Sequence, residues 1–345
     1  MERSTLYSVL TAGLLMGGST LQALSAEVTL TLSHFLSPQS STHVNFLQPW
    51  AERVEEQSDG RIEVKIFPSM TLGGKPPELY SQVRDGAADI AWTLPGYTPG
   101  VFPRSEVFEL PTVHTSSATT TTLAIQDVMD DIAADFDDVK LILLHAHAGQ
   151  ALHLTDGCVE GLDGFDGLKL RTPSRTGGWM IEALGAEPVG MPVPALTQAL
   201  ANGGVDGALI PFEVMPPLKV QELTECSMTG VADTRFGTAL FMFAMNKSRY
   251  DALPDDLKAV IDANSGANIA DFAGGVWDNS EQIGKDAQIG TGSPINEFSA
   301  DVTEEITSVL GAVVDRWVED VSAQGIDGEN LVKKARAAIA ARGTM

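Results

Sequence analysis

The stretch GLKLRTPSRTGGWMIEALGAEPVGMPVPALTQALANGGVDG, residues 167–207, decides the fold of this chain. Apolar residues alternate with others over 168–170 and 189–193, as they do in short buried strands. Compact helices are expected over 177–184 and 195–200. Strands that alternate with helices indicate βαβ units, so the sequence predicts an α/β fold with a mostly parallel sheet.

Arg171 lies near the carboxyl end of the first of these strands, directly before a Thr172-Pro173 turn. In open α/β sheets, ligands bind beyond the carboxyl ends of the strands. A guanidinium group there can bind a carboxylate through two parallel hydrogen bonds. We therefore predict that Arg171 binds a carboxylate ligand. The alternative is an intramolecular salt bridge between Arg171 and an acidic side chain.

Residues 1–26 have the pattern of a secretory signal peptide. Arg3 precedes an apolar run over 6–18 that is too short to span a bilayer, and the small residues at 23–26 provide a cleavage site. The mature chain is expected to begin at Ala26 or Glu27, in the bacterial periplasm. No later stretch approaches about 18 uninterrupted apolar residues, so no direct membrane insertion is predicted.

The charge balance limits the classes of partner. The formal net charge is −24, from 46 acidic and 22 basic residues, and this disfavours nucleic acids and anionic membranes as partners. The charges are dispersed along the chain, which is typical of a solvated surface. An anionic ligand would therefore need a local arginine in a water-excluded cleft to attract it.

Both cysteines, Cys158 and Cys226, lie in the same half of the chain. In an exported protein a disulfide between them is feasible. The alternative is two buried free thiols that behave as small hydrophobic side chains.

The chain is long enough for two domains. Strands and helices are expected to alternate over 28–34, 44–58, 61–67, 79–84, 88–92, 118–134 and 140–144. The apolar segment 237–245 is predicted to be a central strand that crosses back. A long helical stretch after Pro254 is expected to be loosened by Gly266, Gly274 and Gly275, and two helices, 302–317 and 328–341, end the chain. The predicted domains are 27–149 with about 238–280, and 150–237 with about 281–345.

Short motifs in a characteristic order run through most of the chain. They are Trp50-Ala51-Glu52-Arg53-Val54, Ser58-Asp59-Gly60-Arg61, Phe67-Pro68-Ser69, Leu72-Gly73, Gly86-Ala87-Ala88-Asp89-Ile90-Ala91, the block 167–173, Ala183-Leu184-Gly185-Ala186, Val205-Asp206-Gly207, Met245-Asn246-Lys247 and Leu253-Pro254. Because these motifs occur together in this order and spacing, the chain resembles the solute-binding proteins of tripartite ATP-independent periplasmic (TRAP) transporters, the DctP-like family.

The resemblance implies a two-lobed periplasmic binding protein clamshell, with long helices that bridge the lobes. Such a protein closes around a small organic acid and delivers it to the membrane subunits of the transporter, and it is commonly a monomer. Arg171 matches the carboxylate-binding arginine of the family. Some relatives carry a further arginine at a position that corresponds approximately to Ala151 in this chain. A second cationic side chain that faces the ligand's carboxylate is therefore not expected.

Further ligand-binding candidates lie at or after other strand ends. Trp92, Tyr97 and Phe212 could form aromatic walls, although core or hinge packing explains them equally well. His34 ends the first strand and could donate to a ligand oxygen, unless it is a solvated or capping residue. Thr238 offers a hydroxyl group near the strand that crosses back.

The histidines 145, 147 and 153 are candidate metal ligands. His145 and His147 share one face of a strand and could hold a metal ion, but two imidazoles without a nearby Cys, Asp or Glu in the same strand are a weak signal for a metal site. We therefore predict no metal and no cofactor, and we expect His147 to face the cleft and hydrogen-bond the ligand.

The sequence gives no indication of an enzyme. It contains no G-x-S-x-G, P-loop, H-E-x-x-H or strand-linked G-x-G-x-x-G motif. The alternatives are a periplasmic hydrolase or lyase of small carboxylates, or the binding protein of an ATP-driven importer. The segment 208–212 is apolar, and one arginine in such surroundings favours a small monocarboxylate, hydroxy acid or keto acid over a sugar acid.

Overall fold

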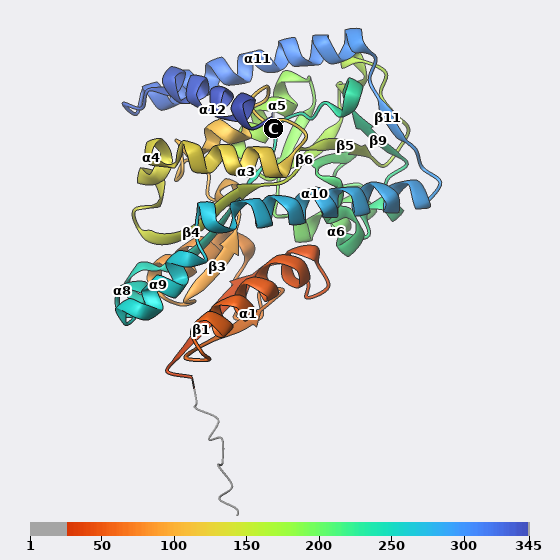
Figure 1. The fold of residues 1–345 in the computed structure, drawn as a ribbon. Helices are drawn as coiled ribbons and strands as arrows, with labels where there is room; N and C mark the ends of the chain where they lie inside the picture. Colours follow the sequence, from red (N-terminus) through yellow and green to blue (C-terminus); the bar gives the residue numbers. More distant parts are fainter. Residues whose placement is uncertain (1–25, 344–345) are drawn as a thin grey trace, which may run out of the picture.

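The computed structural model describes residues 26–343, which form two β-sheets with helices packed around them (Figure 1). The predicted signal peptide falls almost wholly on residues 1–25, outside the described part. Within 26–343, no helix combines the length and apolar character that a membrane crossing requires. The mixed α/β architecture with two lobes confirms the predicted fold class.

The first sheet has the strand order β2-β1-β3-β10-β4. Its strands are β1 (Val28–His34), β2 (Ile62–Phe67), β3 (Ile90–Thr93), β4 (Val139–Ala146) and β10 (Leu240–Asn246). β1 pairs in parallel with β2 and β3, whereas β10 runs antiparallel between β3 and β4. Every residue of β10 is buried, as its continuous apolar sequence predicts for a strand flanked on both sides. This sheet and its helices form lobe I.

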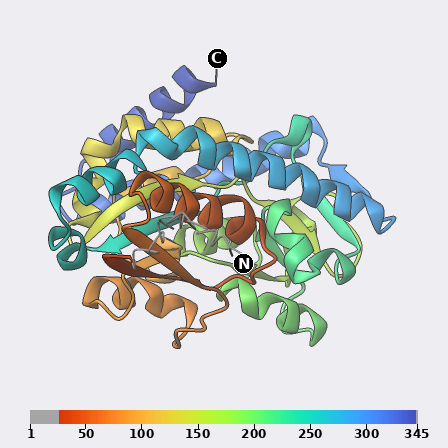
Figure 2. The same cartoon turned by 60° about the horizontal axis from the view of Figure 1, so that its bottom comes forward.

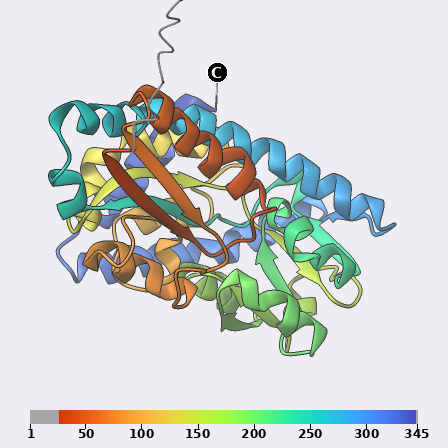
Figure 3. The same ribbon diagram turned by 90° about the horizontal axis from the view of Figure 1, so that it is seen from below.

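The second sheet has the order β11-β9-β5-β8-β6-β7. Its strands are β5 (Ala151–Leu154), β6 (Lys169–Thr172), β7 (Glu187–Gly190), β8 (Gly207–Ile210), β9 (Cys226–Thr229) and β11 (Ile295–Glu297). β6 pairs in parallel with both β7 and β8, so the stretch 167–207 forms the predicted βαβ units. This sheet and its helices form lobe II, on the opposite side of the molecule from β1 and β2 (Figure 3).

The helices cover the two sheets. They are α1 (Gln48–Gln57), α2 (Leu79–Asp85), α3 (Ala118–Asp127), α4 (Met129–Ile132), α5 (Arg175–Ala183), α6 (Leu196–Ala201), α7 (Met215–Leu218), α8 (Lys247–Asp251), α9 (Asp255–Ala263), α10 (Ala267–Gly290), α11 (Ala300–Ser322) and α12 (Gly328–Arg342). A π-helical turn, Thr42–Leu47, leads into α1.

Three segments of the chain connect the two sheets. The chain passes from β4 to β5 through 147–150, and it returns from β9 to β10 through 230–239. The third crossing is α10, which packs against α3 and β4 of lobe I and against β11 of lobe II, and Figure 2 shows it extending over both. The helix α12 packs on α3 of lobe I.

One local prediction was wrong, and another was right only in part. Val193 was expected in a strand, but β7 ends at Gly190 and Val193 begins a 3₁₀ turn after Pro192, whose ring cannot donate a hydrogen bond to a sheet ladder. The helix after Pro254 is two helices, because Gly266 adopts φ +55° between α9 and α10. Gly274 and Gly275 lie inside the unbroken α10.

Gly274 allows α10 and α3 to approach closely. A Cβ atom there would lie 2.4 Å from the Cα of Thr119, whereas a Cβ on the neighbouring Gly275 would meet no atom within 4 Å. We expect Gly274→Ala to lower the free energy of unfolding by about 1–3 kcal/mol, as overpacking does. The control Gly275→Ala should be neutral or stabilising by up to about 1 kcal/mol, because alanine favours a helix. Chemical denaturation of both variants measures this, and equal stabilities would contradict the close approach.

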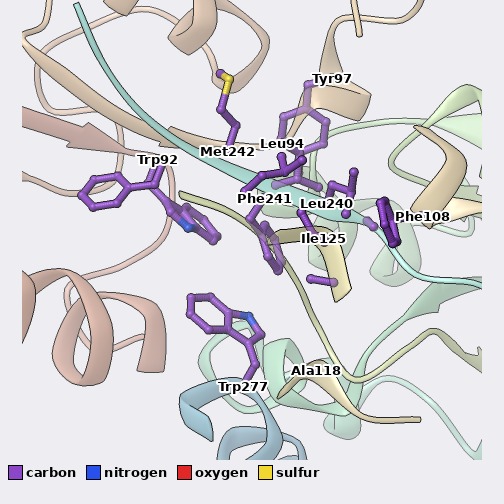
Figure 4. Packing of buried hydrophobic residues seen from close by; sticks show 14 of the residues in the cluster. Trp92, Leu94, Tyr97, Phe108, Ala118, Ile125, Leu240, Phe241, Met242 and Trp277 are labelled. Carbon is purple, nitrogen blue, oxygen red and sulfur yellow. The ribbon is translucent and has the colours of Figure 1, made fainter. Parts of the chain in front are cut away.

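Aromatic side chains fill the core of lobe I and its contact with α10 (Figure 4). The Trp92 indole stacks on Phe241 with ring centroids 4.7 Å apart, and Trp277 of α10 lies 5.4 Å from the same Phe241 ring. Such offset aromatic pairs add to the energy of area burial. In lobe II, Cys158 and Cys226 form a disulfide that ties the loop after β5 to β9.

Candidate ligand-binding site

A cavity lies between the two lobes, where the carboxyl ends of four strands meet. Segments that follow β1, β3, β6 and β8 all line it, as expected for a ligand site in sheets of this kind. The cavity volume is about 40 Å³, or about 410 Å³ when the adjoining space that is open to solvent is counted. The cavity is therefore narrow, and any ligand that it takes is a small molecule.

Most of the cavity wall is apolar. Lobe I contributes Phe35, Leu36, Trp92, Leu94 and Phe241, and the second crossing contributes Ala239. Lobe II contributes Pro173, Val193, Leu209, Ile210, Pro211 and Val214. The Trp92 ring stacks between Phe35 at 5.2 Å and Phe241 at 4.7 Å, which gives lobe I a continuous aromatic wall. Its indole N–H donates to His145 Nε2 at 3.0 Å, so the orientation of the ring is fixed.

Arg171 is the cationic residue of this cavity. It belongs to β6 and is 2% exposed. Its Nε and Nη2 both donate to the backbone carbonyl of Met191, at 3.0 and 2.8 Å. Met191 follows β7, the strand paired with β6, so the parallel register of these strands positions the guanidinium.

No carboxylate within residues 26–343 forms a salt bridge with Arg171. Burial lowers the pKa of Arg171 from its usual value, and the neighbouring Tyr97 opposes that shift through its charge and a hydrogen bond. The Tyr97 hydroxyl also accepts the backbone N–H of Val193 at 2.9 Å. A buried guanidinium without an acidic partner is costly, and a ligand carboxylate would offset that cost.

His147 lines the cavity but its imidazole already has partners in the protein. Nδ1 lies 3.2 Å from Thr238 Oγ1, and Nε2 accepts the N–H of Ala239 at 3.0 Å. Burial lowers the pKa of His147 well below its usual value, so the ring is neutral. His145 is likewise neutral, because burial lowers its pKa to about 3. Within the described residues, no group of three or more His, Cys, Asp or Glu side chains is placed to hold a metal ion.

Sequence reasoning missed two polar residues of the cavity, Gln150 and Glu213. Gln150 lies in the first crossing, is fully buried, and has no hydrogen-bond partner among residues 26–343 for either side-chain atom. Glu213 follows β8 and is 8% exposed. Burial raises the pKa of Glu213 to about 8, and the charge of Glu281 adds to this shift. Neither residue belongs to a motif, so no sequence signal identified them.

The remaining predicted residues do not line the cavity. His34 is buried in lobe I, where its Nε2 lies 2.9 Å from His43 Nδ1. Phe212 packs edge-on against His153, with ring centroids 4.8 Å apart. Thr238 contacts His147, and Tyr97 forms a hydrogen bond with Arg171. The structure therefore brings together three of the seven predicted residues, Arg171, Trp92 and His147, with Tyr97 in contact with the first.

The same fold occurs in solved structures of TRAP solute-binding proteins. One, from a marine metagenome and described as specific for aromatic acid ligands, was solved with metahydroxyphenylacetate. It is 39% identical, with a TM-score of 0.89 over 91% of this chain and 99% of that chain. Another, from Rhodoferax ferrireducens, was solved with copurified benzoate. It is also 39% identical, with a TM-score of 0.88 over 92% and 98% of the two chains.

Sequence comparison agrees with the structural match. The C4-dicarboxylate-binding periplasmic protein DctP of Rhodobacter capsulatus is 24% identical over 317 residues, which are 88% of this chain and 90% of that protein. The family model of the bacterial extracellular solute-binding proteins, family 7, matches residues 32–320. The predicted resemblance is thus confirmed, and the chain belongs to family 7 of the bacterial extracellular solute-binding proteins, the family of TRAP-transporter receptors for small organic acids.

Proposed function

We propose that this protein captures small aromatic monocarboxylates in the cavity between its lobes and delivers them to the membrane subunits of a TRAP transporter. The observation that carries the proposal is Arg171, a buried guanidinium without an acidic partner among residues 26–343, in a cavity with mainly apolar and aromatic walls. A charged carboxylate pairs with the guanidinium, and an aromatic ring replaces water against Phe35, Trp92 and Phe241.

The cavity favours a monocarboxylate over a dicarboxylate or a sugar acid. Arg171 is the single cation among the residues that line it, so a second carboxylate would be buried without a counter-charge. The many hydroxyl groups of a sugar acid would meet aliphatic and aromatic carbon on most sides. Two solved relatives that are 39% identical to this chain, with metahydroxyphenylacetate and with benzoate, support an aromatic acid.

The ligand also favours closure of the lobes. It shifts an open–closed equilibrium only by binding more tightly to the closed form, so it must contact both lobes. Arg171 belongs to lobe II and Trp92 to lobe I, and both face the same cavity. A benzoate-sized molecule held by these residues would stabilise the closed form as a hinge-type clamshell does.

We further infer that the protein is a receptor and not an enzyme, that it acts as a monomer, and that its signal peptide is cleaved on export to the periplasm. The hydrogen bonds of His147 support the first inference, since both ring nitrogens of this cavity histidine already have partners in the protein.

A thermal-shift screen of the mature protein tests the proposed ligand class. The protein is first unfolded and refolded to remove carried-over ligand. Benzoate at about 100 times its dissociation constant should add about 2.7 kcal/mol to the free energy of unfolding and raise the melting temperature. Succinate, glucuronate and benzamide are the matched probes for a second carboxylate, a sugar acid and a neutral ring. Stabilisation by benzamide equal to that by benzoate would refute the role of the carboxylate.

A further inference from the structure

We propose that Gln150 and Glu213 form a polar subsite that binds a hydroxyl group on the aromatic ligand. The protein would then prefer a hydroxy-substituted aromatic monocarboxylate to its unsubstituted parent. This inference rests on the proposed function, because it assigns a second recognition point within the same cavity.

The Gln150 carboxamide is the strongest indication of such a subsite. It is fully buried at the cavity wall, and neither its Oε1 nor its Nε2 has a hydrogen-bond partner within residues 26–343. Its backbone is fixed between two crossings: its N–H donates to the carbonyl of Gly237 at 2.9 Å, and its carbonyl accepts the N–H of Phe236 at 3.3 Å. The backbone at Gln150 is therefore fixed at the cavity wall, and a buried amide in this position needs a hydrogen-bond partner.

A carboxylate alone cannot satisfy this amide. Carboxylate oxygens only accept hydrogen bonds, so they could pair with Nε2 but not with the Oε1 acceptor. A hydroxyl group has both a donor and acceptor lone pairs, and it can donate to Oε1. The other polar groups of the wall do not compete for it, because His147 is occupied by Thr238 and Ala239, and Arg171 donates two bonds to Met191.

Glu213 provides the complementary group. It lies in lobe II, whereas Gln150 lies in the first crossing, and both line the cavity. With a pKa of about 8, raised first by burial and then by Glu281, its carboxyl group is protonated near neutral pH. A neutral carboxyl group can donate a hydrogen bond to the ligand hydroxyl and does not repel the carboxylate bound at Arg171.

Isothermal titration calorimetry with benzoate, 3-hydroxybenzoate and 4-hydroxybenzoate at pH 7 tests the subsite. At least one hydroxybenzoate should bind the wild-type protein about tenfold or more tightly than benzoate does, because the unsubstituted acid leaves buried polar groups unpaired. Gln150→Leu should reduce this preference to less than about threefold. Glu213→Leu should also reduce it, and Glu213→Gln should retain most of it, because an amide keeps a donor and an acceptor.

Gln288 provides the matched control. It is also a fully buried glutamine with an unpartnered side chain among the described residues, but it lies in α10 and does not line the cavity. Gln288→Leu should change neither the affinity for benzoate nor the affinity for the hydroxybenzoates. Equal affinities of wild-type protein for benzoate and both hydroxybenzoates would overturn the subsite and leave the proposed function intact. Binding of none of the aromatic acids would overturn both.

Discussion

Replacing Arg171 with alanine is expected to weaken benzoate binding by more than about 2 kcal/mol, which is about 30-fold in the dissociation constant. The variant removes the cation that would pair with the carboxylate, and it leaves the aromatic wall of lobe I in place. Arg171→Lys should recover little of the loss, because an ammonium group lacks the planar pair of donors. Titration calorimetry of the refolded, ligand-free proteins measures these differences.

The same substitution should not destabilise the ligand-free protein much. Arg171 donates two hydrogen bonds to Met191 but has no acidic partner within 26–343, so its removal relieves the cost of a buried charge. Arg84→Ala is the control for loss of an arginine, since Arg84 is exposed and does not line the cavity. An affinity loss that was the same in both variants, or absent in Arg171→Ala, would remove Arg171 from the site.

The second large effect is expected at Arg235, which joins the three crossings between the lobes. Its fully buried side chain lies in the second crossing and donates to the Gly149 carbonyl of the first at 3.0 Å. It also donates to Glu281 of α10 at 2.7 Å, and it pairs with Asp233 at 3.0 Å. Glu281 is only 6% exposed, so Arg235→Ala would leave a buried carboxylate without its cation.

We expect Arg235→Ala to lower the free energy of unfolding by about 3–5 kcal/mol, the range for one partner removed from a buried pair. The double variant Arg235→Met with Glu281→Leu should be more stable than Arg235→Ala, because it removes the uncompensated charge together with its partner. Denaturant unfolding of the two variants measures this difference.

Arg61 provides the matched control for Arg235, because its ion pairs are exposed. It contacts Glu27 at 2.8 Å and also Asp256, but its side chain is 39% exposed. Arg61→Ala should therefore destabilise the protein much less than Arg235→Ala does, because solvent screens exposed ion pairs. If Arg235→Ala cost no more than Arg61→Ala, the cluster around Arg235 would not stabilise the connection between the lobes.

Much of the fold could be predicted from local patterns. Alternation of apolar residues identified β1 and β2 to within one residue at each end, and the βαβ pattern over 167–207 predicted the parallel pairing of β6 with β7 and β8. Arg171 was predicted as a site residue because a parallel sheet places its ligands at the carboxyl ends of strands. Its position depends mainly on β6 and β7, which are close in sequence.

The rest of the site depends on contacts between distant segments. Trp92 meets Phe241 only because β10 returns to lobe I and pairs with β3, and no local pattern specifies that pairing. His34 was expected in the cavity because it ends β1, but its imidazole contacts His43 of the following turn, and the next residue, Phe35, faces the cavity instead. Gln150 was missed because an unpartnered buried amide becomes visible only when the whole surrounding structure is known.

A crystal structure of the refolded wild-type protein soaked or co-crystallised with benzoate tests the central claim most directly. The account predicts the carboxylate within about 3 Å of the Arg171 guanidinium nitrogens, with the ring against the wall formed by Phe35, Trp92 and Phe241. A benzoate carboxylate bound away from Arg171, or a ring outside the cavity between the lobes, would contradict it.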